Sequence, residues 1–471
     1  MKNNRYSRLL GNSALFAIAN LGTKLIQFLM VPLYTYALTV RQYGVVDLLL
    51  TTVTMLTPIV SLSVFDAVFR FSMDKDHDLS AIFSNGVLIT LAGFLIVLII
   101  SPVNLLVRIP YYSYFLGILF FSAINSLLQN FAKSIGYVKQ FAFSGFLNAV
   151  LVVLLNLLLL VVFKLGVVGY VYGILFASAG TAIYLAISIK AWKFIDLKKL
   201  KFKYCKKLLQ YSAPLIPNSF SWWFTNDANR YFILFFVGAA GNGLYAVANK
   251  IPSILTVFFS IFTQAWQLSA VEEFESKDNG QFYSNIFNYL IFISSIGISG
   301  ILIILKPFMQ VYTSPSFYSS WHFAPFLLMA AVFANLSAFL GTVFIAAKKT
   351  GQILSTTVVG MLINLGLNLL LIPLLGVNGA GIGSGIGFLV VTIIRFRKSK
   401  QFVEIVVDKF LLINVTLVVA LMISAELLVK ETLMTIGLTS GLLIILIVLE
   451  RSYVMEAGRG LRKIIQKVKG Q

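Results

Sequence analysis

The chain has 471 residues, of which 59% are hydrophobic and 11% charged, and its formal net charge is +20. Soluble proteins have roughly twice this charged fraction, and apolar runs of about 18 residues or more recur along the whole chain, so composition excludes an ordinary soluble fold. The single cysteine, Cys205, and the two histidines exclude a disulfide framework and a histidine-based metal site.

Apolar runs of helix length predict a polytopic, all-α membrane protein, because backbone polar groups in lipid must bond within their own segment. About fourteen transmembrane helices are expected. They lie near 11–36, 43–66, 80–102, 112–131, 142–163, 166–189, 211–236, 244–268, 284–305, 323–345, 352–373, 375–395, 410–429 and 432–450. The first run is too long for the apolar part of a signal peptide and is interpreted as a spanning helix.

A basic stretch, Lys190–Lys207, interrupts this pattern with eight lysines against one acidic residue, Asp196. We interpret it as a cytoplasmic linker between two helical bundles. The predicted domains are an N-terminal six-helix bundle (1–189), the linker (190–210), a C-terminal six-helix bundle (211–396), two additional helices (397–450) and a basic cytoplasmic tail (451–471).

The lysines and arginines predict the orientation of the chain. With the N-terminus in the cytoplasm, 29 of the 37 basic residues fall in inner segments and only five in outer loops. This bias is typical of multi-pass proteins of the cell membrane, and an even number of spans places both termini in the cytoplasm. The positive charge therefore indicates contact with anionic membrane lipids rather than with nucleic acid.

Local sequence matches relate the two halves. Asn156 and its following leucines precede a Gly-Val-Val-Gly stretch, as Asn368 and its leucines precede Gly-Val-Asn-Gly. The sixth span of each half then has small residues every four positions, a pattern that lets helix backbones approach closely. A repeat in the same orientation predicts two bundles around a central cavity, the general plan of alternating-access transporters.

Lys24 lies about midway along the first predicted span. Asn20 and Gln27 are at i−4 and i+3 and share its helix face. A charge at mid-bilayer costs on the order of 3 kcal/mol unless it faces a cavity or a partner. The pattern predicts either a cationic contact in a central cavity or a structural ion pair.

Two more cations lie inside predicted spans. Asp227 and Arg230, at i and i+3 in the seventh span, can pair on one helix face. Lys250 lies near the outer part of the eighth span. Each cation either lines the cavity or extends to the membrane interface.

The second span contains two carboxylates, Asp47 and Asp66. Both are candidate partners for these cations or protonatable, ion-coupling groups, although the i, i+4 spacing of Asp66 and Arg70 favours an interfacial pair. Cations in a water-accessible cavity suit a multiply charged anion such as phosphate or pyrophosphate. The sequence predicts no catalytic group, metal site or cofactor, and no nucleotide-binding motif is present.

Several short motifs resemble the Wzx-type polysaccharide (O-antigen and exopolysaccharide) flippases of the multidrug/oligosaccharidyl-lipid/polysaccharide exporter superfamily. The motifs are Arg41-Gln42-Tyr43-Gly44, Ser212-Ala213-Pro214-Leu215-Ile216-Pro217, Asp227 with Arg230, Gly243-Leu244-Tyr245-Ala246-Val247-Ala248-Asn249-Lys250 and Leu375-Gly376-Val377-Asn378-Gly379. The resemblance extends over nearly the whole chain, and it lies in the order and spacing of the motifs.

The resemblance implies translocation of an undecaprenyl-pyrophosphate-linked oligosaccharide across the cytoplasmic membrane by ion-coupled alternating access. Lys24, Arg230 and Lys250 then lie where the family's cavity cations are expected. The polysaccharide polymerase and glycosyltransferases of the same pathway are candidate partners. Two alternatives remain open: a multidrug or cation antiporter of the same superfamily, and a membrane-embedded polymerase or glycosyltransferase.

Overall fold

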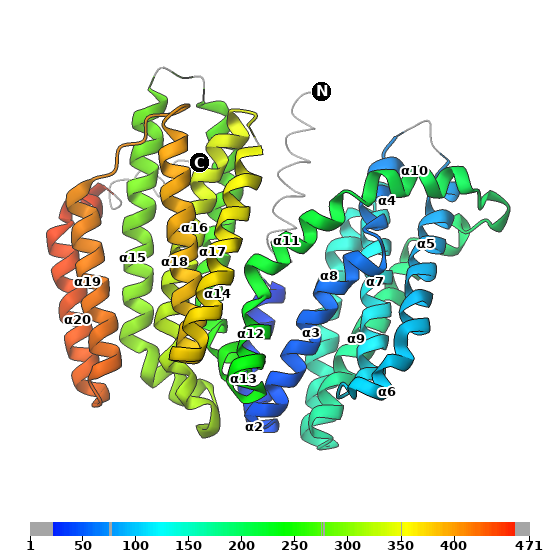
Figure 1. Cartoon of the computed structure of the whole chain (residues 1–471), viewed down its shortest axis with the longest axis horizontal. Coiled ribbons are helices and arrows are strands. Elements are labelled where there is room, and N and C mark those ends of the chain that lie inside the picture. Colours follow the sequence, from blue (N-terminus) through cyan, green and yellow to red (C-terminus); the bar gives the residue numbers. More distant parts are fainter. Residues whose placement is uncertain (1–21, 75–77, 275, 277, 350, 457–471) are drawn as a thin grey trace, which may run out of the picture. The chain divides into compact units, whose positions relative to one another are not determined.

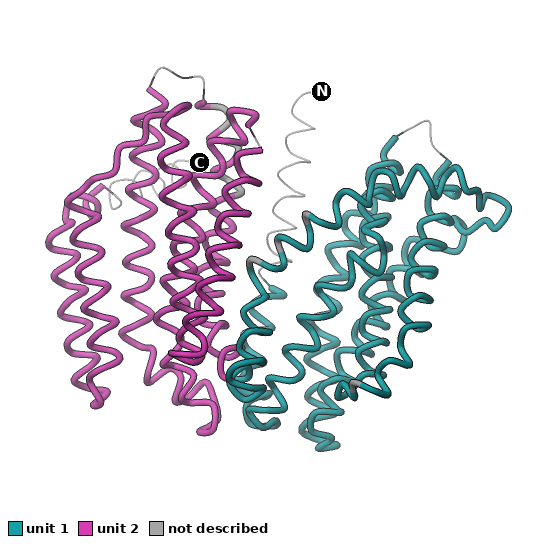
Figure 2. Tube along the Cα trace, in the orientation of Figure 1, with its two compact units in different colours: residues 1–243 teal, residues 244–471 magenta. Residues whose placement is uncertain are grey.

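The computed structural model describes residues 22–74, 78–274, 276, 278–349 and 351–456, and within these ranges every regular element is a helix. Contacts divide the chain into two compact units, residues 1–243 and 244–471 (Figure 2). The helices of unit 1 are α2 (Val31–Ala37), α3 (Val40–Val60), α4 (Val64–Ser72), α5 (Leu79–Ile100), η1 (Ser101–Val103), α6 (Asn104–Val107), α7 (Tyr112–Ser134), α8 (Val138–Asn156), η2 (Leu157–Val162), α9 (Gly166–Ser188), η3 (Ala191–Phe194), η4 (Leu197–Lys199), α10 (Phe202–Ser212), α11 (Leu215–Asp227) and α12 (Asn229–Phe236). Helix α13 (Ala239–Ala248) continues from unit 1 into unit 2.

Unit 2 contains long α-helices (Figure 1), and among its described residues there is one 3-10 segment. Its elements are α14 (Lys250–Glu272), α15 (Asn279–Tyr312), η5 (Pro315–Phe323), α16 (Ala324–Ala346), α17 (Gly351–Leu375), α18 (Val377–Ser399), α19 (Lys409–Leu428) and α20 (Thr432–Leu449). Helix α16 packs against α14 and α18, and the α19–α20 pair packs against α15.

Twelve helical stretches of the described residues are long and apolar enough to cross a membrane. The chain is therefore a multi-pass membrane protein, as predicted, although twelve spans rather than fourteen are found in this part. The first predicted span, 11–36, begins outside the described residues. The seventh, 211–236, is not one continuous helix, because the chain turns before Leu215 and again at Ala228 and so forms α10, α11 and α12.

The core of unit 1 lies where α4, α5, α7 and α9 meet. Phe83 stacks on Phe131, with ring centroids 4.3 Å apart, and Leu127 and Leu185 pack with them at 1% exposure or less. Burying such side chains stabilises a fold by about 1.5–3 kcal/mol each in water, whereas inside a membrane it is close packing that holds the helices together.

The internal repeat is confirmed by helix contacts that occur once in each unit. A Cβ atom on Gly173 of α9 would lie 2.5 Å from the Asn156 side-chain oxygen on α8, and a Cβ atom on Gly383 of α18 would lie 3.1 Å from that of Asn368 on α17. The small residues of the sixth helix therefore make room for the asparagine of the fifth helix in both halves. The asparagines and glycines that match in sequence also match in position.

The connecting segment after each sixth helix is hydrogen-bonded to the third helix of the same half. In unit 1, the Asn85 side chain on α5 donates to the Lys199 carbonyl (3.0 Å) and accepts from the Lys201 N–H (3.2 Å). In unit 2, Asn288 on α15 donates to the Val406 carbonyl (3.1 Å) and accepts from the Asp408 N–H (3.0 Å). We call this pair of contacts the linker clasp.

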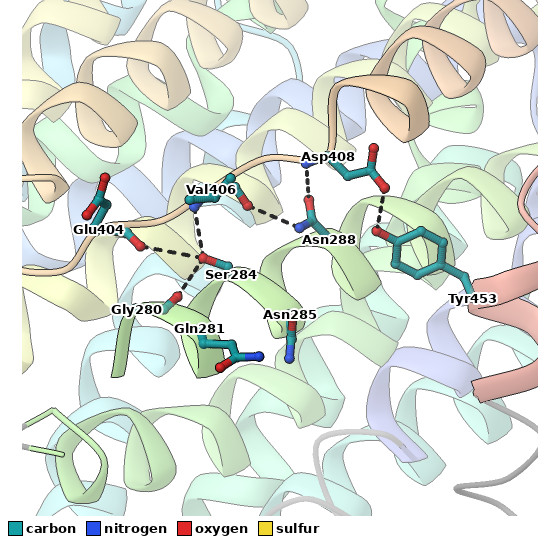
Figure 3. A pocket seen from close by; sticks show the side chains of 9 residues that line it. All are labelled: Gly280, Gln281, Ser284, Asn285, Asn288, Glu404, Val406, Asp408 and Tyr453. Atoms are coloured by element: carbon teal, nitrogen blue, oxygen red, sulfur yellow. Dashed lines mark hydrogen bonds between the residues drawn. The ribbon is translucent and has the colours of Figure 1, made fainter. Parts of the chain in front are cut away.

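A serine of α15 also bonds to this segment in unit 2. The Ser284 hydroxyl accepts from the Val406 N–H (2.8 Å) and donates to the Gly280 carbonyl (2.5 Å), as Figure 3 shows. A cavity of about 540 Å³ lies beside these bonds. Its lining residues are Gly280, Gln281, Ser284, Asn285, Asn288, Glu404, Val406, Asp408 and Tyr453. Three of its polar side chains, Ser284, Asn288 and Tyr453, therefore hold the connecting segment in place.

We predict that replacing Asn85 by Leu destabilises the protein by about 2 kcal/mol, because two backbone groups of the linker lose their buried partner. Thermal unfolding of the purified protein in detergent measures this change. The matched control is Lys199→Met, which removes the partly exposed ion pairs with Asp78 (2.7 Å) and Asp196 (4.0 Å) and is expected to cost much less, because exposed ion pairs contribute little to stability. Equal losses in the two variants would contradict the clasp.

Candidate functional site

Arg230 on α12 lies at the centre of a polar cluster in unit 1. Its guanidinium donates from Nε to Asp47 Oδ2 on α3 (2.7 Å) and from Nη1 to Asp227 Oδ1 on α11 (2.5 Å). The Asn242 amide donates to the Gly44 carbonyl (2.8 Å) and lies 3.3 Å from Asp47 Oδ2. We call Arg230, Asp47, Asp227 and Asn242 the Arg230 cluster.

The cluster is largely buried and its charges do not balance. Side-chain exposure is 12% for Arg230, 16% for Asp47 and 30% for Asp227. One guanidinium faces two carboxylates, so the cluster has a formal charge of −1 when all three groups are ionised. Pairing offsets much of the cost of placing Arg230 in an apolar helix. The cluster in this arrangement suits a proton or a small cation better than an anion.

The break at Ala228 positions Arg230. Because the chain turns there, α11 and α12 follow different directions (Figure 1), and α11 packs against α3 whereas α12 contacts α3 through side-chain bonds. The Trp223 indole on α11 donates to the Thr51 carbonyl (3.2 Å), and the Tyr231 and Thr52 hydroxyls, on α12 and α3, are 2.5 Å apart. These bonds fix α11 and α12 on the α3 face that contains Asp47.

Close backbone contact holds α3 against the start of α13 next to the cluster. A Cβ atom on Gly44 would lie 1.9 Å from the Ala239 carbonyl oxygen, and one on Gly243 would lie 2.1 Å from that of Val40. Only glycine fits at either position. Gly44 ends the Arg-Gln-Tyr-Gly motif and Gly243 begins the Gly-Leu-Tyr-Ala motif, so two motifs far apart in sequence meet here.

The predicted polar stripe of Lys24, Asn20 and Gln27 lies partly outside the described residues. Lys24 and Gln27 are exposed in helical residues 22–29, whereas Asn20 lies outside the described residues. Lys24 forms no ion pair with any other described residue. The structure brings together Arg230, Asp47 and Asp227. The i, i+3 spacing predicts the pair of Arg230 with Asp227, and Asp47 is one of the two candidate partners in the second predicted span.

The remaining predicted residues lie elsewhere. Lys250 is the first residue of α14, in unit 2. Asp66 on α4 is half-buried and interacts electrostatically with Lys133 on α7. The predicted pair of Asp66 with Arg70 is wrong, because Arg70 binds Asp74 one turn later (2.5 Å).

Two cations of unit 2, Arg395 and Lys306, are buried within helices that extend beyond the predicted spans. Arg395 is the last residue of the predicted span 375–395, whereas α18 continues to Ser399. Arg395 is 7% exposed and donates to the Ser337 carbonyl (2.8 Å) and the Thr356 hydroxyl (3.0 Å). Lys306 follows the predicted span 284–305, whereas α15 continues to Tyr312 and Lys306 is 3% exposed within it. Beyond Lys306 the sequence stays mostly apolar up to Tyr312, which is a signal that the helix continues. Beyond Arg395 the charged residues Arg397 and Lys398 follow at once, so the sequence gives no such signal there.

A family model described as "Polysaccharide biosynthesis protein" matches residues 9–267, more than half of the chain. The chain belongs to the polysaccharide biosynthesis protein family. A curated relative, the probable low-salt glycan biosynthesis flippase Agl15 of Haloferax volcanii, is 24% identical over 214 residues. This match covers 45% of each protein, so this chain matches about half the length of that relative.

Solved structures of two transporter types share the fold. A lipid II flippase, MurJ, in an inward closed conformation matches with a TM-score of 0.69 and 11% identity, over 94% of this chain and all of that one. An inward-facing multidrug resistance transporter of the MATE family matches with a TM-score of 0.66 and 14% identity, over 82% of this chain and 94% of that one. The resemblance inferred from the sequence motifs is confirmed by the family match and by this fold.

We predict that Arg230→Met destabilises the protein by about 2–3 kcal/mol, because two carboxylates lose their counter-charge in a largely buried site. Adding Asp47→Asn and Asp227→Asn to the same chain should restore most of the loss. Thermal unfolding of the single, double and triple variants measures this coupling. Additive losses would show that the three side chains act independently.

A second prediction concerns Gly44. Gly44→Ala places a methyl group against the Ala239 carbonyl and should cost about 2 kcal/mol, with reduced transport activity. Gly145→Ala on α8 is the matched control, because nothing lies within 4 Å of its Cβ position. Thermal unfolding of both variants is the measurement. Unchanged stability of Gly44→Ala would contradict the close approach.

Proposed function

We propose that the chain is a flippase that moves an undecaprenyl-pyrophosphate-linked oligosaccharide repeat unit across the cytoplasmic membrane for surface polysaccharide assembly. The single observation behind this proposal is the family match over residues 9–267. The glycan flippase relative and the fold shared with a lipid II flippase agree with it. The protein is then a transporter rather than an enzyme, and its partners are the lipid-linked glycan, membrane lipids and the pathway enzymes that make and polymerise that glycan.

The proposed orientation places both termini and the linker clasps in the cytoplasm. The support is the basic linker of unit 1, whose helix α10 lies across the ends of α4 and α5 (Figure 1). Lysines next to exposed apolar side chains, such as Phe202 at 83% exposure, are typical of the cytoplasmic membrane interface. The two six-helix bundles predicted around the linker are retained in this proposal.

In the proposed mechanism, cations bind the pyrophosphate and carboxylates couple the movement to an ion. Lys24, Arg230 and Lys250 are the proposed anion contacts. Asp47 and Asp227 hold Arg230 in the present arrangement, so a proton or cation on either carboxylate would loosen that hold and free the guanidinium for the substrate. Gln27 and Asn20 are proposed as polar contacts beside Lys24, and Asp66 as a further coupling group.

One observation favours a second candidate, a multidrug or cation antiporter. The Arg230 cluster has an excess of negative charge, and the chain shares its fold with a multidrug transporter. Such a protein would bind organic cations at the carboxylates, whereas the flippase would use the same carboxylates to control Arg230.

Lipid extraction from cells that lack the protein separates the two functions. The flippase requires that a pyrophosphate-linked oligosaccharide accumulates while surface polysaccharide disappears, and mass spectrometry then identifies the cargo. Unchanged lipid-linked sugars together with increased sensitivity to cationic drugs would replace the flippase with the antiporter.

We predict that Lys24→Ala abolishes polysaccharide export while the protein remains in the membrane, because the anionic head group loses a cationic contact. Lys24→Arg should retain part of the activity, since the charge is kept. The matched control is Lys139→Ala on α8, a helix on which no site residue is proposed. Surface polysaccharide is quantified by immunoblotting, and normal export by Lys24→Ala would refute the role of this lysine.

A further inference from the structure

Glu426 is a buried carboxyl near the end of α19, and no hydrogen bond satisfies it. The residue is 1% exposed, and neither of its side-chain oxygens has a hydrogen-bond partner in the part of the chain that the structure describes. Another buried glutamate, Glu450 at 2% exposure, accepts a hydrogen bond from Asn414 (2.7 Å). Burial of a carboxyl group in unit 2 therefore does not by itself leave it unsatisfied.

The charged group facing Glu426 is Lys306 on α15, which acts on the carboxyl electrostatically. The Lys306 ammonium is already well satisfied. It donates to the Val429 carbonyl (2.7 Å) and to the Thr435 hydroxyl (3.3 Å), and it lies 4.5 Å from the centre of the Trp321 ring. The lysine thus contacts the turn after α19, the first turn of α20 and η5.

Few other titratable groups are close to this carboxyl. Tyr318 on η5 interacts electrostatically with Glu426. His322, stacked on Trp321, and the connecting residues Lys430 and Glu431 are exposed. Solvent screens these exposed charges, so Lys306 is the dominant charge acting on Glu426.

An ionised carboxylate without a donor in an apolar interior costs several kcal/mol. Two events relieve this cost: the carboxyl binds a proton, or the ammonium leaves its present partners and pairs with the carboxylate. In this structure the ammonium bonds to Val429 and Thr435, which leaves the proton as the available partner.

We propose that Glu426 and Lys306 form a proton-binding site at the end of the α19–α20 pair. With the proton bound, Glu426 is a neutral acid and Lys306 bonds to Val429 and Thr435. When the proton leaves, it passes to water near the end of α19, only two residues beyond Glu426, and Lys306 pairs with the carboxylate. Because Lys306 is on α15, proton release changes how the α19–α20 pair is held to that helix.

This site is separate from the Arg230 cluster, which lies in unit 1, and it does not depend on the proposed function. The group that binds and releases the proton, Glu426, lies on the α19–α20 pair, the two helices that follow the repeated bundles. The ligand is a proton, so no other small molecule is needed to test it.

Infrared difference spectroscopy of the full-length protein, labelled with carbon-13 glutamate and reconstituted in lipid, tests the proposal. The carbonyl stretch of a carboxylic acid without hydrogen bonds should appear at low pH, shift with the label, and disappear reversibly as pH rises. Glu426→Gln should remove this band, and the matched control Glu450→Gln should retain it. In Lys306→Met the band should persist at every pH used, since the carboxylate then has no counter-charge.

Two results would overturn the proposal. Absence of a glutamic acid band in the wild-type protein at all pH values would mean that Glu426 is permanently ionised. A band that does not change with pH, or that remains in Glu426→Gln, would mean that the site does not exchange protons. The labelled wild-type spectrum decides between titration and its absence even if a variant fails to fold.

Discussion

The need to pair charges inside apolar helices explains most of what is unusual in this structure. Arg230 is held by Asp47 and Asp227, Arg395 by hydroxyls and a carbonyl, and Lys306 by a carbonyl, a hydroxyl and an aromatic ring. Each arrangement lowers the cost of a charge among apolar residues, and each joins helices that are distant in sequence. The same pairings make these places responsive to a change in charge, because protonation of a partner removes part of the compensation.

Close backbone packing is the second constraint, and it explains the motifs. Gly44 and Gly243 allow α3 and the start of α13 to touch, and Gly173 and Gly383 accommodate asparagines of neighbouring helices. Association in a membrane gains little from burying apolar surface, so small residues at contact points contribute the specificity. Two of the motifs that carry the family resemblance therefore contain glycines at close contacts between helix backbones.

The sequence predicts contacts between residues that are close in the chain. It does not predict contacts that depend on how distant helices pack together. Asp227 and Arg230 were predicted to pair because they are three residues apart on one helix, whereas the contact of Arg230 with Asp47 depends on how α12 packs on α3. The repeat was visible as matching asparagines and glycines. The turn at Ala228 lies within the polar run Asn226–Arg230, which the sequence analysis interprets as charges inside one continuous span rather than as a break between helices. The predicted spans also end at Leu305 and Arg395, whereas α15 and α18 continue to Tyr312 and Ser399, since an apolar window ends near the first charge whether or not the helix does.

The central claim is that this chain moves a lipid-linked glycan between leaflets, and reconstitution tests it most directly. The lipid-linked oligosaccharide extracted from the deletion strain would be incorporated into vesicles with the purified protein, and a membrane-impermeant lectin would report the exposed sugar over time. The account predicts that the protein moves sugar between leaflets far faster than protein-free vesicles do, with a rate that depends on the pH gradient. Equal rates with and without the protein, under every gradient, would contradict it.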